Sequence, residues 1–232
     1  MSSALFADRA EAGRALARRL AGQALRPPVV VLALPRGGVP IGAEVARTLG
    51  APLDLLLVRK IGAPGQPELA VAAVAEGPPP QTVVDEALCR TTGARRRDID
   101  RQAQEELVEI ERRRRVYLGG RAPLPVEGAT VVVVDDGIAT GTTVRAALQA
   151  LRRRRPARIV LAVPVGPADT VAALHSESDA DEVLCLEQPA AFRAIGLHYR
   201  EFHQVSDEEV VAALAAAAKS SATRSATGGA TS

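Results

Sequence analysis

The sequence is poor in aromatic residues, with three Phe, two Tyr and no Trp among 232 residues. Proteins that bind single-stranded nucleic acids stack bases on aromatic side chains that lie beside basic residues. Arginine runs occur at 95–97, 112–115 and 152–155, and among the aromatic residues only Tyr117 lies close to one of them. We therefore disfavour nucleic acid as a partner and interpret the runs as solvated helix ends.

Cysteines and long apolar runs are also scarce. Cys89 and Cys185 form no Cys-x-x-Cys pair, so we expect two inert, buried thiols and a cytoplasmic location. No apolar run reaches the roughly 18 residues that a membrane-spanning helix needs. The first residues show no basic stretch followed by an apolar one, so we expect neither a secretory signal nor a membrane partner.

Several kinds of site are disfavoured by missing patterns. The three histidines show no metal-ligand spacing, and no Ser or Cys has a paired base in view, which argues against a zinc site and a nucleophilic hydrolase. Neither a Gly-x-x-x-x-Gly-Lys-Ser/Thr loop nor a Gly-x-Gly-x-x-Gly fingerprint is present, so nucleoside triphosphate and dinucleotide sites are disfavoured.

Apolar runs and helical patterns alternate along the chain. The runs expected as strands lie at 29–34, 53–58, 131–134, 159–163 and 182–186. Helices are expected at 8–22, 40–50, 95–117, 142–154 and 207–218, with one more between the last two strands. This order predicts an α/β fold, a Rossmann-like parallel sheet with helices on both faces, in which ligands bind beyond the carboxyl ends of the strands.

We expect a single domain over residues 1–218 and a disordered tail at 219–232, which lacks apolar periodicity. The Gly- and Pro-containing stretch at 61–67 is typical of a mobile loop. The long charged helix at 95–117 is interpreted as an insertion. It could cover the core or form a homodimer contact, and the sequence leaves both open.

The segment 131–143 carries the most specific chemistry. Four valines end in Asp135 and Asp136, and a loop of small residues then opens a helix. The loop residues are Ala139, Thr140, Gly141, Thr142 and Thr143. Their backbone amides would face a phosphate at a helix N-terminus, and the two carboxylates can accept hydrogen bonds from ribose hydroxyls. The segment therefore predicts a ribose-5-phosphate site.

This segment resembles the phosphoribosyl-pyrophosphate motif of type I phosphoribosyltransferases. The resemblance implies that fold, with a flexible lid and a small C-terminal hood. It also implies transfer of a 5-phosphoribosyl group from 5-phosphoribosyl pyrophosphate to a nucleobase-like nitrogen acceptor, with release of pyrophosphate. Magnesium is implied with the substrate, held mainly by substrate oxygens rather than directly by the protein. In such an enzyme Asp135 and Asp136 would hold the sugar, and Asp136 is expected to be catalytic.

Two further segments fall where this family places its parts. Arg36, Gly37 and Gly38 follow the first buried strand and resemble the family's pyrophosphate loop, in which small residues let backbone amides approach a diphosphate. Arg59 and Lys60 end the second strand, and both are expected to stabilise the departing pyrophosphate. Lys60 is the only lysine before Lys219, which hints at a role for a compact ammonium.

The stretch from Arg59 to Glu76 resembles adenine phosphoribosyltransferases, where a basic pair precedes a flexible lid and a glutamate approaches the purine. By this resemblance residues 61–76 would close over the site, and Glu76 would handle a proton on the incoming base. An equally weighted interpretation makes Glu76 a solvent-facing turn carboxylate.

The hood is expected at 187–206, where residues 191–199 resemble the corresponding part of hypoxanthine-type enzymes. Phe192 is the first candidate to stack on the acceptor and Tyr199 the second, although either could belong to the core. Ala139 stands where 6-oxopurine enzymes carry an acidic general base, which makes hypoxanthine or guanine a doubtful substrate.

Nearly the whole chain resembles a bacterial group of predicted phosphoribosyltransferases whose acceptor the sequence does not name. The alternative hypothesis is a non-catalytic protein on the same fold that senses 5-phosphoribosyl pyrophosphate or a nucleotide and regulates a partner.

Overall fold

The computed structural model describes residues 4–77 and 79–227. A five-stranded sheet lies at its centre, with the strand order β2-β1-β6-β7-β8 and all neighbouring strands parallel. Its strands are β1 (Val29–Ala33), β2 (Leu53–Leu55), β6 (Thr130–Val134), β7 (Arg158–Val165) and β8 (Glu182–Glu187). The predicted α/β fold is therefore confirmed.

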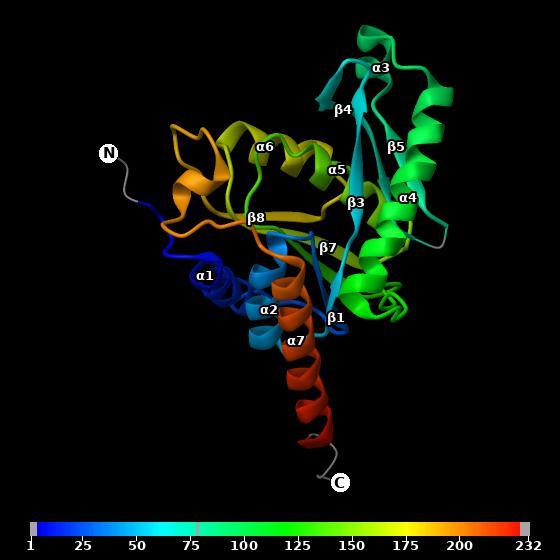
Figure 1. Ribbon diagram of the computed structural model, residues 1–232. Coiled ribbons are helices and arrows are strands. Elements are labelled where there is room, and N and C mark those ends of the chain that lie inside the picture. The colour runs from blue at the N-terminus through cyan, green and yellow to red at the C-terminus, as the bar shows by residue number, and fades with distance from the viewer. Residues whose placement is uncertain (1–3, 78, 228–232) are drawn as a thin grey trace.

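Helices cover both faces of this sheet (Figure 1). On one side lie α1 (Arg9–Ala21) and α2 (Gly38–Leu49), and on the other α5 (Thr142–Arg152) and α6 (Ala168–Glu177). Successive strand residues point to opposite faces. Accordingly Val132 and Val134 pack in the core with α1 and α2, whereas Val131 and Val133 pack in the core with α5. Burial on both faces explains why residues 29–33 of β1 and 131–134 of β6 are all apolar.

A second sheet stands beside the first and is antiparallel, with the order β3-β4-β5 (Figure 1). Its strands are β3 (Val58–Ala63), β4 (Gln66–Ala75) and β5 (Gln81–Val84), and α3 (Glu86–Thr92) and α4 (Arg96–Leu118) follow them. The strand predicted at 53–58 is thus two strands, because the chain leaves the central sheet after Leu55 and joins the second sheet at Val58.

The prediction of a mobile loop at 61–67 is wrong. Ala63 pairs with Gln66, so Pro64 and Gly65 are the two central residues of a hairpin turn. Proline favours the first of these positions, and Gly65 has a φ of 73°, which a glycine adopts without strain. The Gly and Pro residues therefore make a turn between paired strands.

The long charged helix covers the core, since Ile99, Ala103 and Ile110 of α4 are buried. Tyr117 at its end donates a hydrogen bond of 2.7 Å to Asp207, which begins α7 (Asp207–Thr227). The last helix is longer than predicted, since it continues past residue 218 to Thr227. Of the tail predicted at 219–232, residues 228–232 lie outside the described residues.

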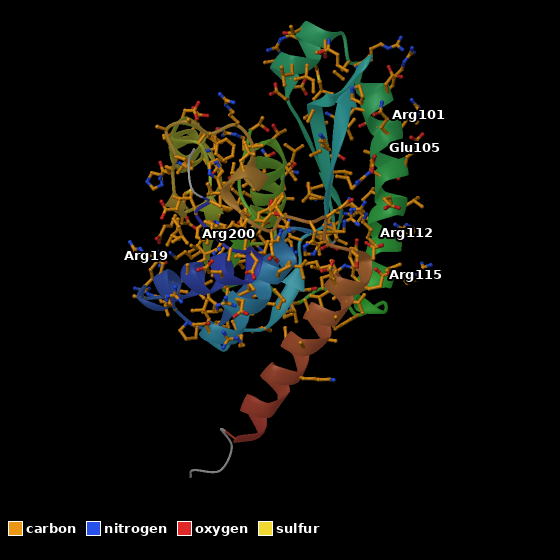
Figure 2. The ribbon with its side chains drawn as sticks, turned by 60° about the vertical axis from the view of Figure 1, so that its left-hand side comes forward. Arg19, Arg101, Glu105, Arg112, Arg115 and Arg200 are labelled. Carbon is orange, nitrogen blue, oxygen red and sulfur yellow. The ribbon has the colours of Figure 1, made fainter. Side chains whose placement is uncertain are left out.

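The arginine run at 112–115 is only partly solvated. Figure 2 shows Arg112 and Arg115 on the outer side of α4, whereas Arg114 is turned inward and bonded to Glu76. Within the described chain, no helix is both long and apolar enough to cross a membrane. Burial raises the pKa of the Cys185 thiol to about 11, which fits the expectation of an inert cysteine.

Candidate functional site

Asp135 and Asp136 directly follow β6, at the carboxyl edge of the central sheet. The loop after β1 runs against them, because Leu34 donates a backbone hydrogen bond of 2.9 Å to the carbonyl of Val134. A Cβ added to Gly37 would lie 2.0 Å from Oδ2 of Asp136, and one added to Gly38 would lie 2.9 Å from Cα of Asp135. Only glycine permits this approach, so the structure brings the predicted pyrophosphate loop and the acidic pair together.

The loop after the acidic pair leads into the N-terminus of α5. Gly141 has a φ of 75° and precedes Thr142, the first residue of the helix. Among the described residues no side chain caps this helix end, so its first amides are open to an anion. Thr140 and Thr142 place their hydroxyl oxygens 3.3 Å apart beside these amides. This geometry suits a phosphate group.

A buried arginine that sequence reasoning missed holds one of the two acids. Asp8 caps α1, and Arg9, the first residue of that helix, places its Nε 2.8 Å from Oδ2 of Asp136. Nη1 of Arg9 donates a 2.8 Å hydrogen bond to the carbonyl of His203. The guanidinium also lies 3.8 Å from the centroid of the Phe202 ring, a stacking contact. Arg9 therefore ties the N-terminal helix, the acidic pair and residues 202–203 together.

The backbone of Asp136 is also fixed, since the Tyr199 hydroxyl donates a 2.6 Å hydrogen bond to its carbonyl. Tyr199 is buried, and burial together with the charge of Asp136 raises the pKa of its hydroxyl. The hydroxyl therefore stays protonated and serves as a donor. Tyr199, expected as a second candidate for stacking on the acceptor, instead supports the acidic pair.

Burial dominates the electrostatics of the acidic pair. It raises the pKa of Asp135 well above its ordinary value, and the neighbouring charge of Asp136 adds to that increase. Burial also raises the pKa of Asp136, although the bond from Arg9 opposes the effect. The pair thus carries unfavourable charge that a cationic or hydroxyl-bearing ligand would relieve.

A cleft of about 320 Å³ opens beside the pair, and it is lined by Arg9, Arg36, Gly37, Asp136 and residues 202–205. The aromatic residue at this cleft is Phe202, whose exposed fraction is 36%. Phe192, the residue expected to stack on an acceptor, packs instead against His198 with ring centroids 5.2 Å apart. The hood still reaches the motif loop, because a Cβ on Gly137 would lie 2.7 Å from the side chain of Ile195.

The basic pair on β3 divides between two faces. Arg59 places its Nε 2.6 Å from the Glu106 carboxylate of α4. Since alternate strand residues face opposite ways, Lys60 shares the other face with Val58, which packs in the core containing α5. Lys60 is exposed there. Only the lysine therefore lies on the side of the central sheet.

Glu76 is not brought to the acidic pair. Both of its carboxylate oxygens are bonded by Arg114, at 2.5 and 2.8 Å, and Oε1 also accepts a 3.1 Å bond from the amide of Leu57. Glu76 is 7% exposed, so it is not the solvent-facing turn carboxylate of the alternative interpretation.

The sequence contained no local signal for the partners of the acidic pair and of Glu76. Arg9 and Asp136 are 127 residues apart, and Glu76 and Arg114 are 38 apart. Phe202 lies in the stretch 187–206 that was expected as the hood, but only Phe192 and Tyr199 were named there as stacking candidates.

Comparisons with known proteins identify the family to which the chain is similar. A family model for the phosphoribosyl transferase domain matches residues 6–201. A Mycobacterium tuberculosis protein, provisionally named a phosphoribosyl transferase in two strains, is 49% identical over 210 residues, which are 90% of this chain and 46% of that protein. The chain thus spans about half the length of these curated relatives. The crystal structure of TT1426 from Thermus thermophilus is 42% identical, has a TM-score of 0.77 and aligns over 90% of this chain and 97% of its own.

Proposed function

Because the chain belongs to the phosphoribosyl transferase family, we propose that it transfers a 5-phosphoribosyl group from 5-phosphoribosyl pyrophosphate to a nitrogen acceptor. In this reaction the bond from the anomeric carbon to pyrophosphate breaks, and pyrophosphate leaves with the electron pair. The acceptor nitrogen uses its lone pair to form a bond to the same carbon, and the proton that it carried is lost to solvent. The observation that carries the proposal is the contact of Gly37 and Gly38 with Asp136 and Asp135, next to the open N-terminus of α5.

The 5-phosphate would bind to the amides and hydroxyls of residues 139–143, where the helix dipole favours negative charge. Asp135 would accept hydrogen bonds from the ribose hydroxyls. Asp136 lies beside it with its carboxylate oriented by Arg9, so Arg9 acts as a positioning residue. Fixed dipoles and charges at a reacting centre lower the barrier without reorganisation during the reaction.

The pyrophosphate would lie over the loop at 36–38, whose small residues allow backbone amides to approach it. Arg36 lines the same cleft as Asp136, with its Nη1 3.6 Å from Oδ1 of Asp207, and it would add a second positive charge. Lys60, on the central-sheet face of the β3–β4 hairpin, would approach the leaving group when this hairpin closes over the site. Arg59 and Glu76 are held by Glu106 and Arg114, so we assign them no contact with substrate.

Magnesium fits this site, because Asp135 and Asp136 supply the carboxylate oxygens that this ion accepts, directly or through water. Bound to the pyrophosphate, it would neutralise charge that develops on the leaving group. The acceptor would occupy the cleft beside Phe202, where an aromatic ring and Arg9 offer a surface for stacking.

Pyrophosphate release tests the proposal. Purified protein would be mixed with 5-phosphoribosyl pyrophosphate, magnesium and pools of nucleobases and amines, with D135N/D136N as the control. We expect release that depends on one acceptor and disappears in the control. An Asp136→Asn variant with wild-type kinetics would contradict the assignment.

A second candidate is a sensor of 5-phosphoribosyl pyrophosphate or a nucleotide. The ion pairs of Arg59 and Glu76 favour it, since two residues expected to do chemistry are bound within the protein. Tight binding of 5-phosphoribosyl pyrophosphate without pyrophosphate release from any pool would support the sensor.

A further inference from the structure

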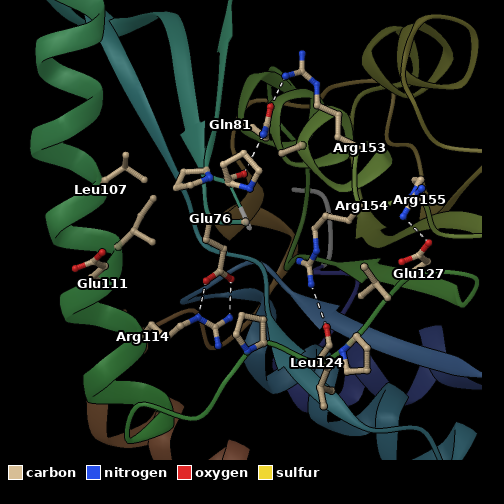
Figure 3. A pocket seen from close by; sticks show the side chains of 18 residues that line it. Glu76, Gln81, Leu107, Glu111, Arg114, Leu124, Glu127, Arg153, Arg154 and Arg155 are labelled. Atoms are coloured by element: carbon tan, nitrogen blue, oxygen red, sulfur yellow. Dashed lines mark hydrogen bonds and ion pairs between the residues drawn. The ribbon is translucent and has the colours of Figure 1, made fainter.

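Figure 3 shows a larger cavity, of about 650 Å³, and neither Asp135 nor Asp136 lines it. Its walls come from α4, residues 76–77 and 79–81, residues 123–127 and residues 150–155 at the end of α5. Residues 123–127 precede β6 and residues 153–155 follow α5, and the two segments are joined by a 3.0 Å backbone hydrogen bond from Gly128 to Arg155. The cavity is therefore at the amino edge of the central sheet, opposite the site proposed for the ribose phosphate.

Some of the charged side chains that line this cavity form ion pairs, and others do not. Arg114 is bonded to Glu76, and Arg155 lies 2.7 Å from Glu127. Arg153 and Arg154 differ, since neither forms an ion pair with a carboxylate in the part of the chain that the structure describes. Arg154 donates a 3.0 Å hydrogen bond to the carbonyl of Leu124.

Arg153 donates to the side-chain oxygen of Gln81 on β5, again a neutral acceptor (Figure 3). Figure 3 shows the guanidinium of Arg153 turned toward Gln81 and that of Arg154 turned the opposite way, toward Leu124. Both have only neutral acceptors, and each keeps several donor hydrogens for a ligand. Glu111 adds a carboxylate on the opposite wall, on α4.

The position of Arg154 favours an anion. Burial lowers the pKa of its guanidinium, and the nearby charge of Arg114 lowers it further, against the opposing charges of Glu76 and Asp54. A half-buried cation that lacks a direct counter-ion is unfavourable in free energy. A bound phosphate would supply the missing charge and accept two or more hydrogen bonds, for which the planar guanidinium is well shaped.

The remaining lining is largely apolar. It includes Leu107, Ile110, Pro79, Pro80, Pro123 and Pro125. Small-molecule sites commonly combine such an apolar lining with a few polar groups, within volumes of roughly 300 to 1,000 Å³. The cavity fits the volume of a nucleotide, with a ring against the prolines and a phosphate against the arginines.

We propose that this cavity is a second ligand site that binds a phosphorylated ring compound of nucleotide size, with its phosphate on Arg154 and another of its oxygens on Arg153. The site is also placed to influence the hairpin. Glu76 lines the cavity and holds the amide of Leu57, the residue before β3, on which Lys60 lies. Occupancy would therefore bias the position of the β3–β4 hairpin. The binding itself does not depend on the proposed transferase activity.

Isothermal titration with ADP tests the proposal, in a D135N/D136N background that removes the acids of the other site. In that background R153Q and R154Q would be compared with R97Q, which removes the same charge from an exposed position on α4. Arg153 is exposed, so R153Q remains informative even if R154Q folds poorly. Thermal melting would verify the fold of each variant.

We expect ADP to bind D135N/D136N and D135N/D136N/R97Q with equal affinity, and adenosine and inorganic phosphate each to bind more weakly. Loss of a hydrogen bond to a charged group weakens binding by roughly tenfold or more, so R153Q and R154Q should each show that loss. Absence of ADP binding in D135N/D136N would overturn the proposal, as would equal affinities for R153Q, R154Q and R97Q. Neither result bears on pyrophosphate release by the wild type, so the two proposals fail separately.

Discussion

Replacing Arg9 by Gln is the most informative perturbation of the acidic pair. The ion pair of Arg9 with Asp136 is 2.8 Å long, and the two side chains are only 9% and 12% exposed. Gln retains a donor but no charge, so Asp136 would be left as a buried carboxylate beside Asp135. Removing one partner of a buried ion pair typically costs about 3–5 kcal/mol, and loss of the stacking on Phe202 adds about 0.5–1 kcal/mol. At pH 8 we expect the free energy of unfolding to fall by about 4 kcal/mol.

The pH dependence of this loss identifies its cause. Burial raises the pKa of Asp136 above its ordinary value, and Arg9 limits that increase, so the pKa should rise further in R9Q. The loss in free energy of unfolding therefore reaches its full value above the pKa that Asp136 has in the variant. It shrinks as the pH falls toward the lower pKa of the wild type, because a protonated carboxyl needs no cation. Below that pKa about 1 kcal/mol should remain, from lost stacking and packing.

Urea denaturation of R9Q and the wild type from pH 4 to pH 9, followed by circular dichroism, measures this deficit. A double-mutant cycle with D136N supplies the control, since R9Q/D136N should be much more stable than the sum of the single losses predicts. Equal deficits at pH 4 and pH 8, or additive losses in the cycle, would refute the electrostatic reasoning and leave Arg9 as a packing residue.

Three further changes test other parts of the site. Asp135→Asn keeps the oxygen that accepts the hydrogen bond from the Asp136 amide but removes a carboxylate whose pKa is raised, so Tm should increase at pH 8 and not at pH 4. The same variant should bind 5-phosphoribosyl pyrophosphate at least tenfold more weakly in calorimetry. Gly37→Ala would place a Cβ 2.0 Å from Asp136, and we expect a loss of about 1–3 kcal/mol in stability and weaker substrate binding; an unchanged melting curve would show that this contact is absent. Lys60→Gln should lower kcat/KM for pyrophosphate release roughly tenfold in a variant whose fold is verified by circular dichroism, and unaltered kinetics would remove Lys60 from the mechanism.

The central sheet was predictable because its three inner strands, β1, β6 and β7, are largely apolar runs. Residues 131–134 show this most clearly, since both faces of β6 are buried and four consecutive valines satisfy both. The hairpin of β3 and β4 was missed for a physical reason. Its turn has only two residues, Pro64 and Gly65, and the same residue types also signal an unpaired loop.

Parts of the site that depend on neighbouring sequence were predictable, whereas parts that depend on distant pairing were not. The acidic pair, the loop at 139–143 and the glycines at 37–38 lie at strand ends whose position follows from the parallel sheet. The partners Arg9 and Arg114 sit on helices that pack against the site only after folding. Phe192 and Phe202 are both aromatic residues of the predicted hood, so the sequence alone does not distinguish them. The folded path of the hood places Phe202 at the cleft and Phe192 against His198.

The central claim is that Asp135, Asp136 and the loop at 139–143 bind 5-phosphoribosyl pyrophosphate. Calorimetric titration of the wild type and of D135N/D136N with 5-phosphoribosyl pyrophosphate and magnesium tests it most directly. We predict one site per chain in the wild type and a loss of at least 100-fold in affinity, about 2.7 kcal/mol, in the variant. Equal affinity in the two proteins, or no binding by the wild type, would contradict the account.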